Sequence, residues 1–213
     1  KFIRENKDFN GTISFIITGD EEADSVNGVK KVVKWLKENN IRIDGSIATE
    51  SSSEKIIGDQ IKVGRKGAVD VQVQIIGKQG HAAYPHLAQN PLHCLSKVIS
   101  FFDDQKLDDG AEYFEPSTLQ FTQINLNNKA KNVIPEKLIT VGDMRFNDNW
   151  DQEKIQNYFH EHLTEICSKN NCLYKLKLTF RGMPFQAFDN PFTKHCIKAI
   201  KDVTGLKASQ DTG

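Results

Sequence analysis

No hydrophobic run in this sequence comes close to the roughly 20 residues that a membrane-spanning helix requires. The chain also lacks the charged and apolar opening regions of a secretory signal peptide. An excess of charge is missing as well, because 28 Lys and Arg balance 28 Asp and Glu. This balance argues against a basic surface for nucleic acid or membranes. We therefore expect a soluble, cytoplasmic protein with neither nucleic acid nor a membrane as partner.

Cysteine is scarce too. The four cysteines, Cys94, Cys167, Cys172 and Cys196, form no C-x-x-C pair, which argues against a disulfide framework and against a zinc site made of thiolates. We expect buried or half-buried thiols. What the chain does have is an ordinary globular composition, with 38% hydrophobic and 26% charged residues. Its 213 residues are enough to bury roughly 70% of the unfolded surface, so the core needs no covalent reinforcement.

The first 65 residues have the pattern of an α/β domain. A near-continuous apolar run over 12–18 predicts a strand covered on both faces. Apolar residues at helical spacing predict a helix over 26–36, and 45–49 reads as a second strand. A strand–helix–strand unit implies a mostly parallel sheet with covering helices, to which 61–65 adds a further strand.

A second pattern begins at about residue 66. Residues 69–75 alternate between apolar and polar side chains, as in a sheet with one wet face. Further elements are expected in the order helix, strand, strand, helix, strand, at 91–102, 117–126, 136–146, 151–168 and 174–181. This order is that of a ferredoxin-like α+β unit, predicted to span 66–182 as an insertion. A helix starting at Asn190-Pro191 returns the chain to the first domain, whose second part is 183–213.

Carboxylates follow two strands of the expected parallel sheet, at the ends where such sheets bind ligands. Asp20, Glu21 and Glu22 come directly after the first strand, and three adjacent carboxylates repel one another unless a cation or protons compensate. Glu50 ends the next strand, so a shared metal site is one interpretation. Ordinary alternatives remain open, since acids favour helix N-termini and often serve as caps.

A histidine-rich loop follows the alternating strand. It reads Gly80-His81-Ala82-Ala83-Tyr84-Pro85-His86. A histidine beside glycine after a strand can serve catalysis or simply fill a turn, and the loop by itself favours neither interpretation.

Several segments together resemble the M20 family of zinc amidohydrolases and peptidases. The resemblance extends over essentially the whole chain and is greatest to the desuccinylase branch, with a deacetylase as the alternative. It rests on motifs that occur in family order: Thr18-Gly19-Asp20-Glu21-Glu22, Glu50, Gly64-Arg65-Lys66-Gly67, the loop from Gly80 to His86, Asn132-Val133-Ile134-Pro135 and Arg145-Phe146-Asn147.

The resemblance implies amide hydrolysis at a site with two zinc ions, replaceable by cobalt. By the family pattern Glu21 is the general base, Glu22 is a ligand of one zinc, and Glu50 is a ligand of the other. The remaining ligands, two histidines and a bridging aspartate, would lie outside the 213 residues, so both ends look cut. Glu50 also stands in Thr-Glu-Ser instead of the family's usual Gly-Glu-Pro.

The resemblance also implies a homodimer that binds a small N-acyl diamino acid. His81 would come from the partner subunit's inserted lid and dimerisation domain to stabilise an oxyanion. Tyr84, Asn132, Arg65 and Arg145 match positions that bind substrate. Two hypotheses about this chain follow. It is either part of a dizinc hydrolase, or a metal-poor dimerisation scaffold that is inactive alone.

Overall fold

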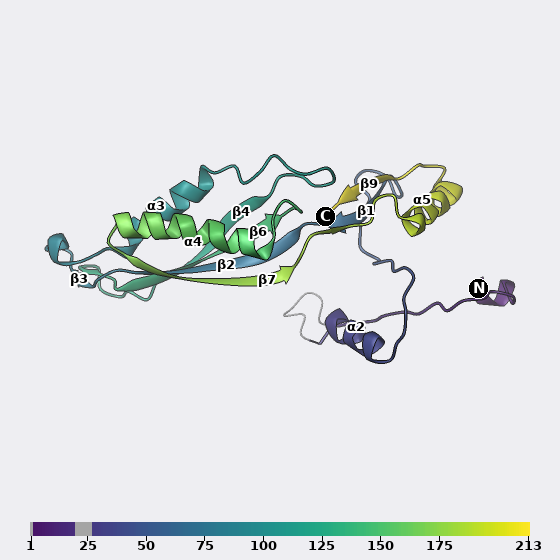
Figure 1. The fold of residues 1–213 in the computed structure, drawn as a ribbon, viewed down its shortest axis with the longest axis horizontal. Coiled ribbons are helices and arrows are strands. Elements are labelled where there is room, and N and C mark those ends of the chain that lie inside the picture. Colours follow the sequence, from purple (N-terminus) through teal and green to yellow (C-terminus); the bar gives the residue numbers. More distant parts are fainter. Residues whose placement is uncertain (1, 20–26) are drawn as a thin grey trace. The chain divides into compact units, whose positions relative to one another are not determined.

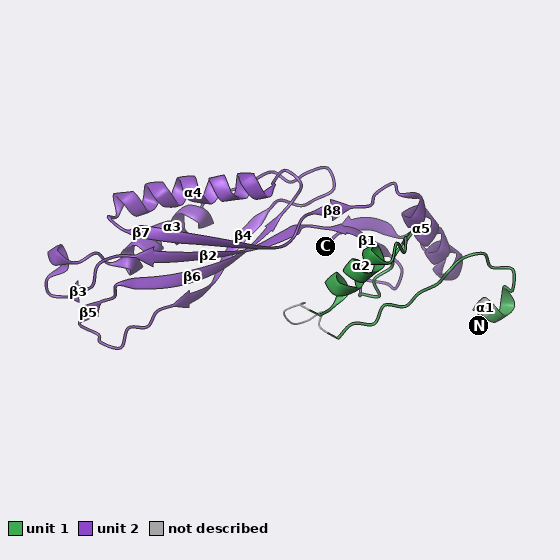
Figure 2. Cartoon of the chain, turned by 60° about the horizontal axis from the view of Figure 1, so that its bottom comes forward, with its two compact units in different colours: residues 1–50 green, residues 51–213 purple. Residues whose placement is uncertain are grey.

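A computed structural model of the chain describes residues 2–19 and 27–213. They form two compact units, residues 1–50 and residues 51–213, coloured separately in Figure 2. Figure 1 labels the elements along the chain. No helix in these described ranges is both long and apolar enough to cross a membrane.

The first unit contains two helices, α1 (Phe2–Glu5) and α2 (Val29–Glu38). Helix α2 confirms the helical pattern predicted over 26–36, shifted by two to three residues. The strands expected at 12–18 and 45–49 are wrong, because neither segment is a strand in this structure. A buried strand is held by ladders to neighbours on both sides, and no ladder forms within the described part of this unit. The apolar run is accordingly exposed, with Phe15 at 88% and Ile17 at 93%.

A small sheet in the second unit carries the α/β pattern. Its strands β1 (Gln60–Arg65), β8 (Phe185–Gln186) and β9 (Ser209–Thr212) lie in the order β8-β1-β9. Strand β1 is parallel to β9 and antiparallel to β8. The strand predicted at 61–65 is thus confirmed, and its parallel neighbour is β9. Helix α5 (Pro191–Thr204) connects β8 to β9 and ends at Gly205, whose φ of 75° is the left-handed conformation that favours glycine.

The larger sheet has four antiparallel strands in the order β4-β6-β2-β7. With its two long helices it confirms the predicted βαββαβ order and the ferredoxin-like unit. The fold is therefore α/β with an α+β unit beside the small sheet. The long elements of this unit are β2 (Gly67–Ile76), α3 (Pro91–Asp103), β4 (Thr118–Asn125), β6 (Lys137–Phe146), α4 (Gln152–Lys169) and β7 (Leu173–Gly182). Its short ones are β3 (Gly80–His81), η1 (Pro85–Leu87) and β5 (Val133–Ile134).

Polar residues cap the N-termini of the two long helices of this unit. The Asn90 side chain accepts a hydrogen bond from the backbone N–H of Leu92 at 3.0 Å, with proline in the first helical turn. At α4 the Asp151 side chain accepts from the Lys154 N–H at 2.7 Å. Each cap satisfies one of the amide groups that a helix start leaves unpaired, which fixes where the helix begins.

The core lies between the two helices and one face of the larger sheet. The inward residues of β2 are Val69, Val71, Val73 and Ile75, all 0% exposed. Their polar neighbours in the chain face the other way, which is why the two-residue period was readable in the sequence. The cysteines are free thiols; Cys94, Cys167 and Cys172 are buried and Cys196 is half-buried, as predicted.

Two of the family-like motifs meet at the beginning of β2. Gly67 is paired with Phe146 of the neighbouring strand β6. A Cβ atom at residue 67 would overlap the Phe146 ring, and that ring is 0% exposed. The glycine is therefore required by packing. This contact links the Gly64-Arg65-Lys66-Gly67 segment to Arg145-Phe146-Asn147 in space.

Candidate functional site

His81, Tyr84 and Asn132 come together at one end of the larger sheet. His81 lies in β3, where it pairs with Val133 of β5, and the backbone N–H of Ala82 donates to the Asn132 carbonyl at 2.8 Å. The Asn132 amide lies 3.4 Å from His81 Nε2. The short β3–β5 ladder therefore holds two segments that are some 50 residues apart in sequence side by side.

Backbone contacts determine the tautomer of His81. The N–H of Ala83 donates to His81 Nδ1 at 3.1 Å. A ring nitrogen that accepts a hydrogen bond carries no proton, so the neutral imidazole carries its proton on Nε2. The Asn132 atom nearest to Nε2 is Nδ2. Because the two amide orientations are interchangeable, the turned amide presents its oxygen to this N–H. His81 thus offers an N–H donor beside Asn132.

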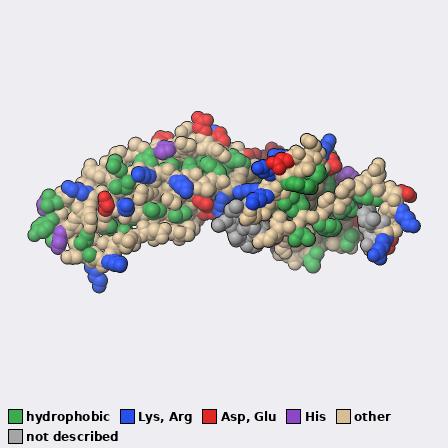
Figure 3. Space-filling model, turned by 90° about the horizontal axis from the view of Figure 1, so that it is seen from below, with side chains coloured by type: hydrophobic (Ala, Val, Ile, Leu, Met, Phe, Trp, Pro, Cys, Tyr) green, Lys and Arg blue, Asp and Glu red, His purple; other side chains and the backbone are tan. Residues whose placement is uncertain are grey.

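Tyr84 completes this group. Its ring centroid lies 5.8 Å from that of His81, and the side chain is 57% exposed. Gly80 allows the loop to fold back, because a Cβ there would lie 2.7 Å from the Cβ of Ala88. Histidine, basic and hydrophobic side chains all occur at this end of the molecule (Figure 3). We call His81, Tyr84 and Asn132 the tip group.

Arg65 and Arg145 lie at the opposite end of the larger sheet. Arg145 of β6 and Gly182 of β7 both pair with Ala68, near the beginning of β2. Arg65 ends β1, and its Nη2 would be 2.6 Å from a Cβ on Gly182. Both guanidinium side chains therefore come from positions around the first residues of β2. We call these two residues the arginine group.

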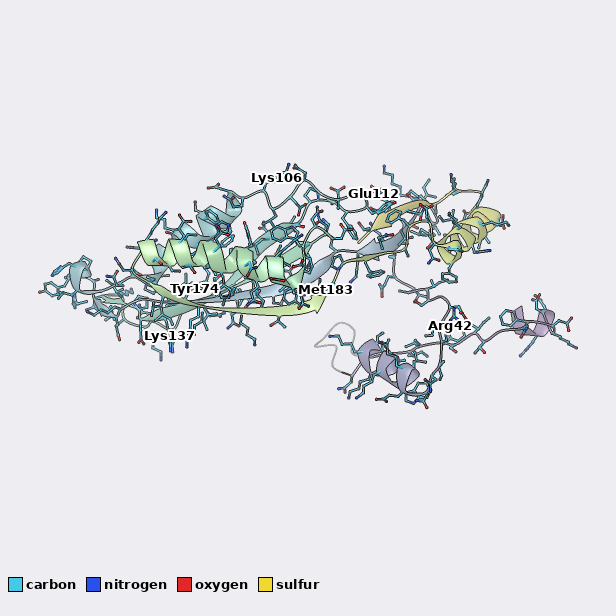
Figure 4. All side chains as sticks on the ribbon, in the orientation of Figure 1. Arg42, Lys106, Glu112, Lys137, Tyr174 and Met183 are labelled. Carbon is cyan, nitrogen blue, oxygen red and sulfur yellow. The ribbon has the colours of Figure 1, made fainter. Side chains whose placement is uncertain are left out.

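Strand β2 separates the two groups. Ten residues of extended chain from Gly67 to Ile76 measure about 30 Å. Figure 4 labels Lys137, at the beginning of β6 near the tip, and Met183, just after β7 at the other end. Substrates that touch both groups would have to be far longer than a diamino acid. The two groups of one chain therefore cannot bind the same small molecule.

The predicted metal ligands are not brought together by the described residues. Glu21 and Glu22 lie outside the described ranges. Glu50 is exposed at the end of the first unit. In the parts of the chain that the structure describes, no group of three or more His, Cys, Asp or Glu side chains is placed to hold a metal. Because catalytic zinc takes about three protein ligands, the donors present do not amount to a zinc site.

Asn147, part of the Arg145-Phe146-Asn147 motif, has a structural role that the sequence did not reveal. It is 0% exposed, and its Nδ2 donates to Asp108 Oδ1 at 2.7 Å. The Trp150 indole donates to the other carboxylate oxygen at 2.7 Å, and the N–H of Gly110 donates to Oδ1 at 2.8 Å. Asp108 thus ties the chain after α3 to the turn after β6. Nothing in the sequence around Asp108 indicated this role.

The hydrogen bonds also control the ionisation of Asp108. Burial raises the pKa of this carboxyl, but hydrogen bonds from Ser117, Trp150 and the backbone outweigh burial and lower the pKa from 3.8 to about 2. A carboxyl with a lowered folded-state pKa stabilises the fold above its unfolded pKa, and this contribution disappears as the pH falls through the folded value.

Replacing Asp108 with Asn is expected to destabilise the protein most at neutral pH. The difference from the wild type should shrink as the pH falls from 3.8 towards 2. Urea denaturation at pH 7 and at pH 3 measures it. Asp109→Asn, at a neighbouring side chain that is 88% exposed, is the control. A difference that stayed the same at both pH values would contradict the assignment.

Comparison with known proteins gives the family. Residues 63–171, just over half of the chain, match the peptidase dimerisation domain, M20_dimer. The chain belongs to this family. The matched region contains β2 to α4 of the ferredoxin-like unit, and β7 (Leu173–Gly182) follows it in the chain. The family resemblance drawn from the motifs is thus confirmed.

Curated relatives carry the name succinyl-diaminopimelate desuccinylase. The protein of that name from Orientia tsutsugamushi (strain Ikeda) is 39% identical over 215 residues, covering 99% of this chain and 53% of the relative. The one from Pelagibacter ubique is 36% identical, covering 99% of this chain and 55% of the relative. The chain thus spans about half the length of the curated relatives it matches.

Solved structures share the fold. The aminopeptidase PepT from Bacillus cereus superimposes with a TM-score of 0.75 at 17% identity, over 99% of this chain and 53% of that one. A tripeptidase from Staphylococcus aureus gives a TM-score of 0.66 at 20% identity, over 88% of this chain and 48% of that one. At these identities the likeness concerns the fold alone.

Proposed function

We propose that this chain is part of a zinc-dependent amide hydrolase that removes the succinyl group from N-succinyl-LL-2,6-diaminopimelate. Relatives of that name at 36–39% identity over nearly the whole chain support the reaction. The observation that carries the proposal is the tip group, in which a backbone contact leaves the proton of His81 on Nε2 beside Asn132. Residues 1–65 and 183–213 are proposed as the catalytic domain and 66–182 as its inserted domain. Its location in the cytoplasm stays a prediction.

Each site residue has a proposed task. Glu21 accepts the proton of the attacking water and passes it to the leaving amine. His81 donates from Nε2 to the developing oxyanion, a position where a preorganised donor lowers the barrier more than in water. Glu22 and Glu50 remain the proposed ligands of two zinc ions. We derive no step through the metal, because the described residues do not assemble its site.

Substrate recognition divides between the two groups. Arg65 and Arg145 suit the carboxylates of an N-acyl diamino acid, since the guanidinium fork binds a carboxylate through two parallel hydrogen bonds. Tyr84 and Asn132 supply hydroxyl and amide groups beside His81. Because the two groups lie about 30 Å apart in one chain, a complete site is proposed to combine the arginine group of one subunit with the tip group of another.

A homodimer through the inserted domain provides that second subunit. The matched family is described as a dimerisation domain, and β4 and β7 are the edge strands of the larger sheet. Strand β7 carries Lys175, Lys177 and Arg181, charges of the kind that discourage pairing with another chain. Strand β4 carries no charged residue, and Ile124 on it is 55% exposed. We propose β4 as the edge that meets its copy.

The substrate and the metal are tested together. A version extended to the length of the relatives is expected to bind zinc and to hydrolyse N-succinyl diaminopimelate faster than N-acetylornithine. The 213-residue chain should bind little zinc and show no hydrolysis, because about three protein ligands are needed for each catalytic ion. Zinc content by elemental analysis and amine release by a colorimetric assay give both values.

The outcomes separate the alternatives. Preference for the acetyl substrate would make the protein a deacetylase of acetylornithine or of another N-acyl amino acid. An extended version without zinc or hydrolysis would leave the dimerisation scaffold as the function. Hydrolysis by the 213-residue chain alone would contradict our account of the metal ligands. Treating the extended version with a chelator and restoring it with zinc or cobalt is the control for metal dependence.

A further inference from the structure

Four charged side chains form a chain of ion pairs on the face of the larger sheet that the helices leave uncovered. Arg145 and Asp143 lie on β6, Asp70 on β2 and Arg181 on β7. Arg181 reaches across β2, with Nε 3.1 Å from Asp70 Oδ1 and Nη2 paired with Asp143 Oδ2. Asp143 also accepts from Arg145 Nε at 2.6 Å. One carboxylate therefore binds two guanidinium groups from different strands.

The contact leaves the outer end of the Arg145 guanidinium free to bind. Asp143 accepts from Nε at 2.6 Å and from Nη2 at 3.4 Å, which occupies one side of the group. A guanidinium has five N–H groups, so three remain, at least one on each terminal nitrogen. Those two terminal nitrogens form the end-on fork that binds a carboxylate bidentately. Asp143 can hold Arg145 without competing for the same donors.

Arg181 orients the Asp143 carboxylate, and this carboxylate in turn holds Arg145. Asp143 Oδ1 accepts from Arg145 Nε, and Oδ2 pairs with Arg181 and also lies 3.4 Å from Arg145 Nη2. Arg181 is itself held by Asp70. The Asp143 side chain is 30% exposed and that of Arg145 is 52% exposed. A half-exposed arginine without partners samples many rotamers and loses that freedom when it binds a ligand. Holding it beforehand reduces this loss and so strengthens binding.

We infer that Asp143 and Arg181 are positioning residues that orient Arg145 towards a carboxylate of the substrate. Asp143 contacts Arg145 directly, and Arg181 acts on Arg145 by orienting Asp143. The inference rests on the proposed function, in which Arg145 binds a carboxylate. It names two residues outside the motifs that identified the family.

Kinetics of the full-length protein test the inference. Asp143→Asn should raise KM for N-succinyl diaminopimelate about three- to tenfold and leave kcat within about twofold, because a charge-assisted hydrogen bond at a partly exposed position is lost. Arg181→Gln should raise KM about twofold. The control is Asp202→Asn, which breaks the exposed Lys198–Asp202 pair on α5 and should change neither constant. An unchanged KM in Asp143→Asn would overturn the inference.

A double-variant comparison separates positioning from a merely structural effect. If Asp143 acts through Arg145, then adding Asp143→Asn to Arg145→Ala should raise KM no further. A further increase in that background would show that Asp143 acts by another route, and would overturn the inference.

Chemical modification of Arg145 tests the positioning role without any catalytic assay, so its result does not depend on the proposed function. Phenylglyoxal modifies free guanidinium groups, and mass spectrometry of the Arg145 peptide gives the rate at that residue. Asp143→Asn should speed modification of Arg145 several-fold, whereas Asp202→Asn should not. Equal rates in the wild type and Asp143→Asn would overturn the positioning role. Failure of the wild type to hydrolyse any N-acyl diamino acid would instead reject the proposed function.

Discussion

Full-length chains carrying His81→Ala and chains carrying Glu21→Gln are each expected to be nearly inactive alone and to recover activity when combined. Loss of an oxyanion donor costs about 10²–10³-fold in kcat, and loss of a general base costs about 10²–10⁴-fold. In a random mixture of a two-fold symmetric dimer, half of the dimers contain one chain of each kind. Each such dimer has one complete site, so about a quarter of wild-type activity should return.

This expectation rests on the proposed arrangement, in which Glu21 acts in the subunit that supplies the arginine group and His81 comes from its partner. The tip group and the arginine group of one chain are separated by the length of β2, about 30 Å. A site that needs both must take them from two chains. Co-expression with two affinity tags yields the mixed dimers for assay.

The matched control combines His81→Ala chains with chains that carry both substitutions. That mixture has no complete site in any pairing and should stay inactive. If the first mixture also stayed inactive although mixed dimers were isolated, His81 and Glu21 would have to act in the same chain. The proposed subunit arrangement would then be rejected.

Replacing Gly67 with Ala is expected to destabilise the ferredoxin-like unit by about 1–3 kcal/mol, the usual cost of forcing an extra methyl group into a packed core. The added Cβ would overlap the Phe146 ring, which is completely buried. Neither the ring nor the strand can move without disturbing the pairing of Gly67 with Phe146. Urea denaturation of the full-length protein measures the loss.

A second substitution tests the cause. Phe146→Leu removes the ring and creates space at the same contact, so Gly67→Ala should cost less in that background than in the wild type. The single variant Phe146→Leu is the reference. Equal costs in both backgrounds would show that the strand conformation at residue 67 matters, and that the ring contact does not.

The long elements of the ferredoxin-like unit were predictable because their signals are local. The alternation over 69–75 and the Asn90-Pro91 helix start each depend on residues within one strand or one turn. The strands predicted at 12–18 and 45–49 failed for the opposite reason. An apolar run indicates that a strand would be stable in the middle of a sheet, but it does not supply the neighbours whose ladders make it a strand.

The candidate site was predictable only in part. The motif order identified the family and pointed to His81, Tyr84 and Asn132, which the structure brings together. The motif order gave no sign that Arg65 and Arg145 lie at the opposite end of β2 from the tip group. The predicted roles of Glu21, Glu22 and Glu50 stay predictions, since two of these residues lie outside the described ranges.

The order of apolar and polar residues along this chain was enough to give the βαββαβ succession, and the order of its motifs pointed to the family. Sheet order, in contrast, came only from the three-dimensional structure. Placing β2 between β6 and β7 is what allows Arg181 to reach Asp143, and pairing β3 with β5 is what sets Asn132 beside His81. Side-chain periodicity is a property of neighbouring residues, whereas strand pairing depends on the free energy of the whole sheet.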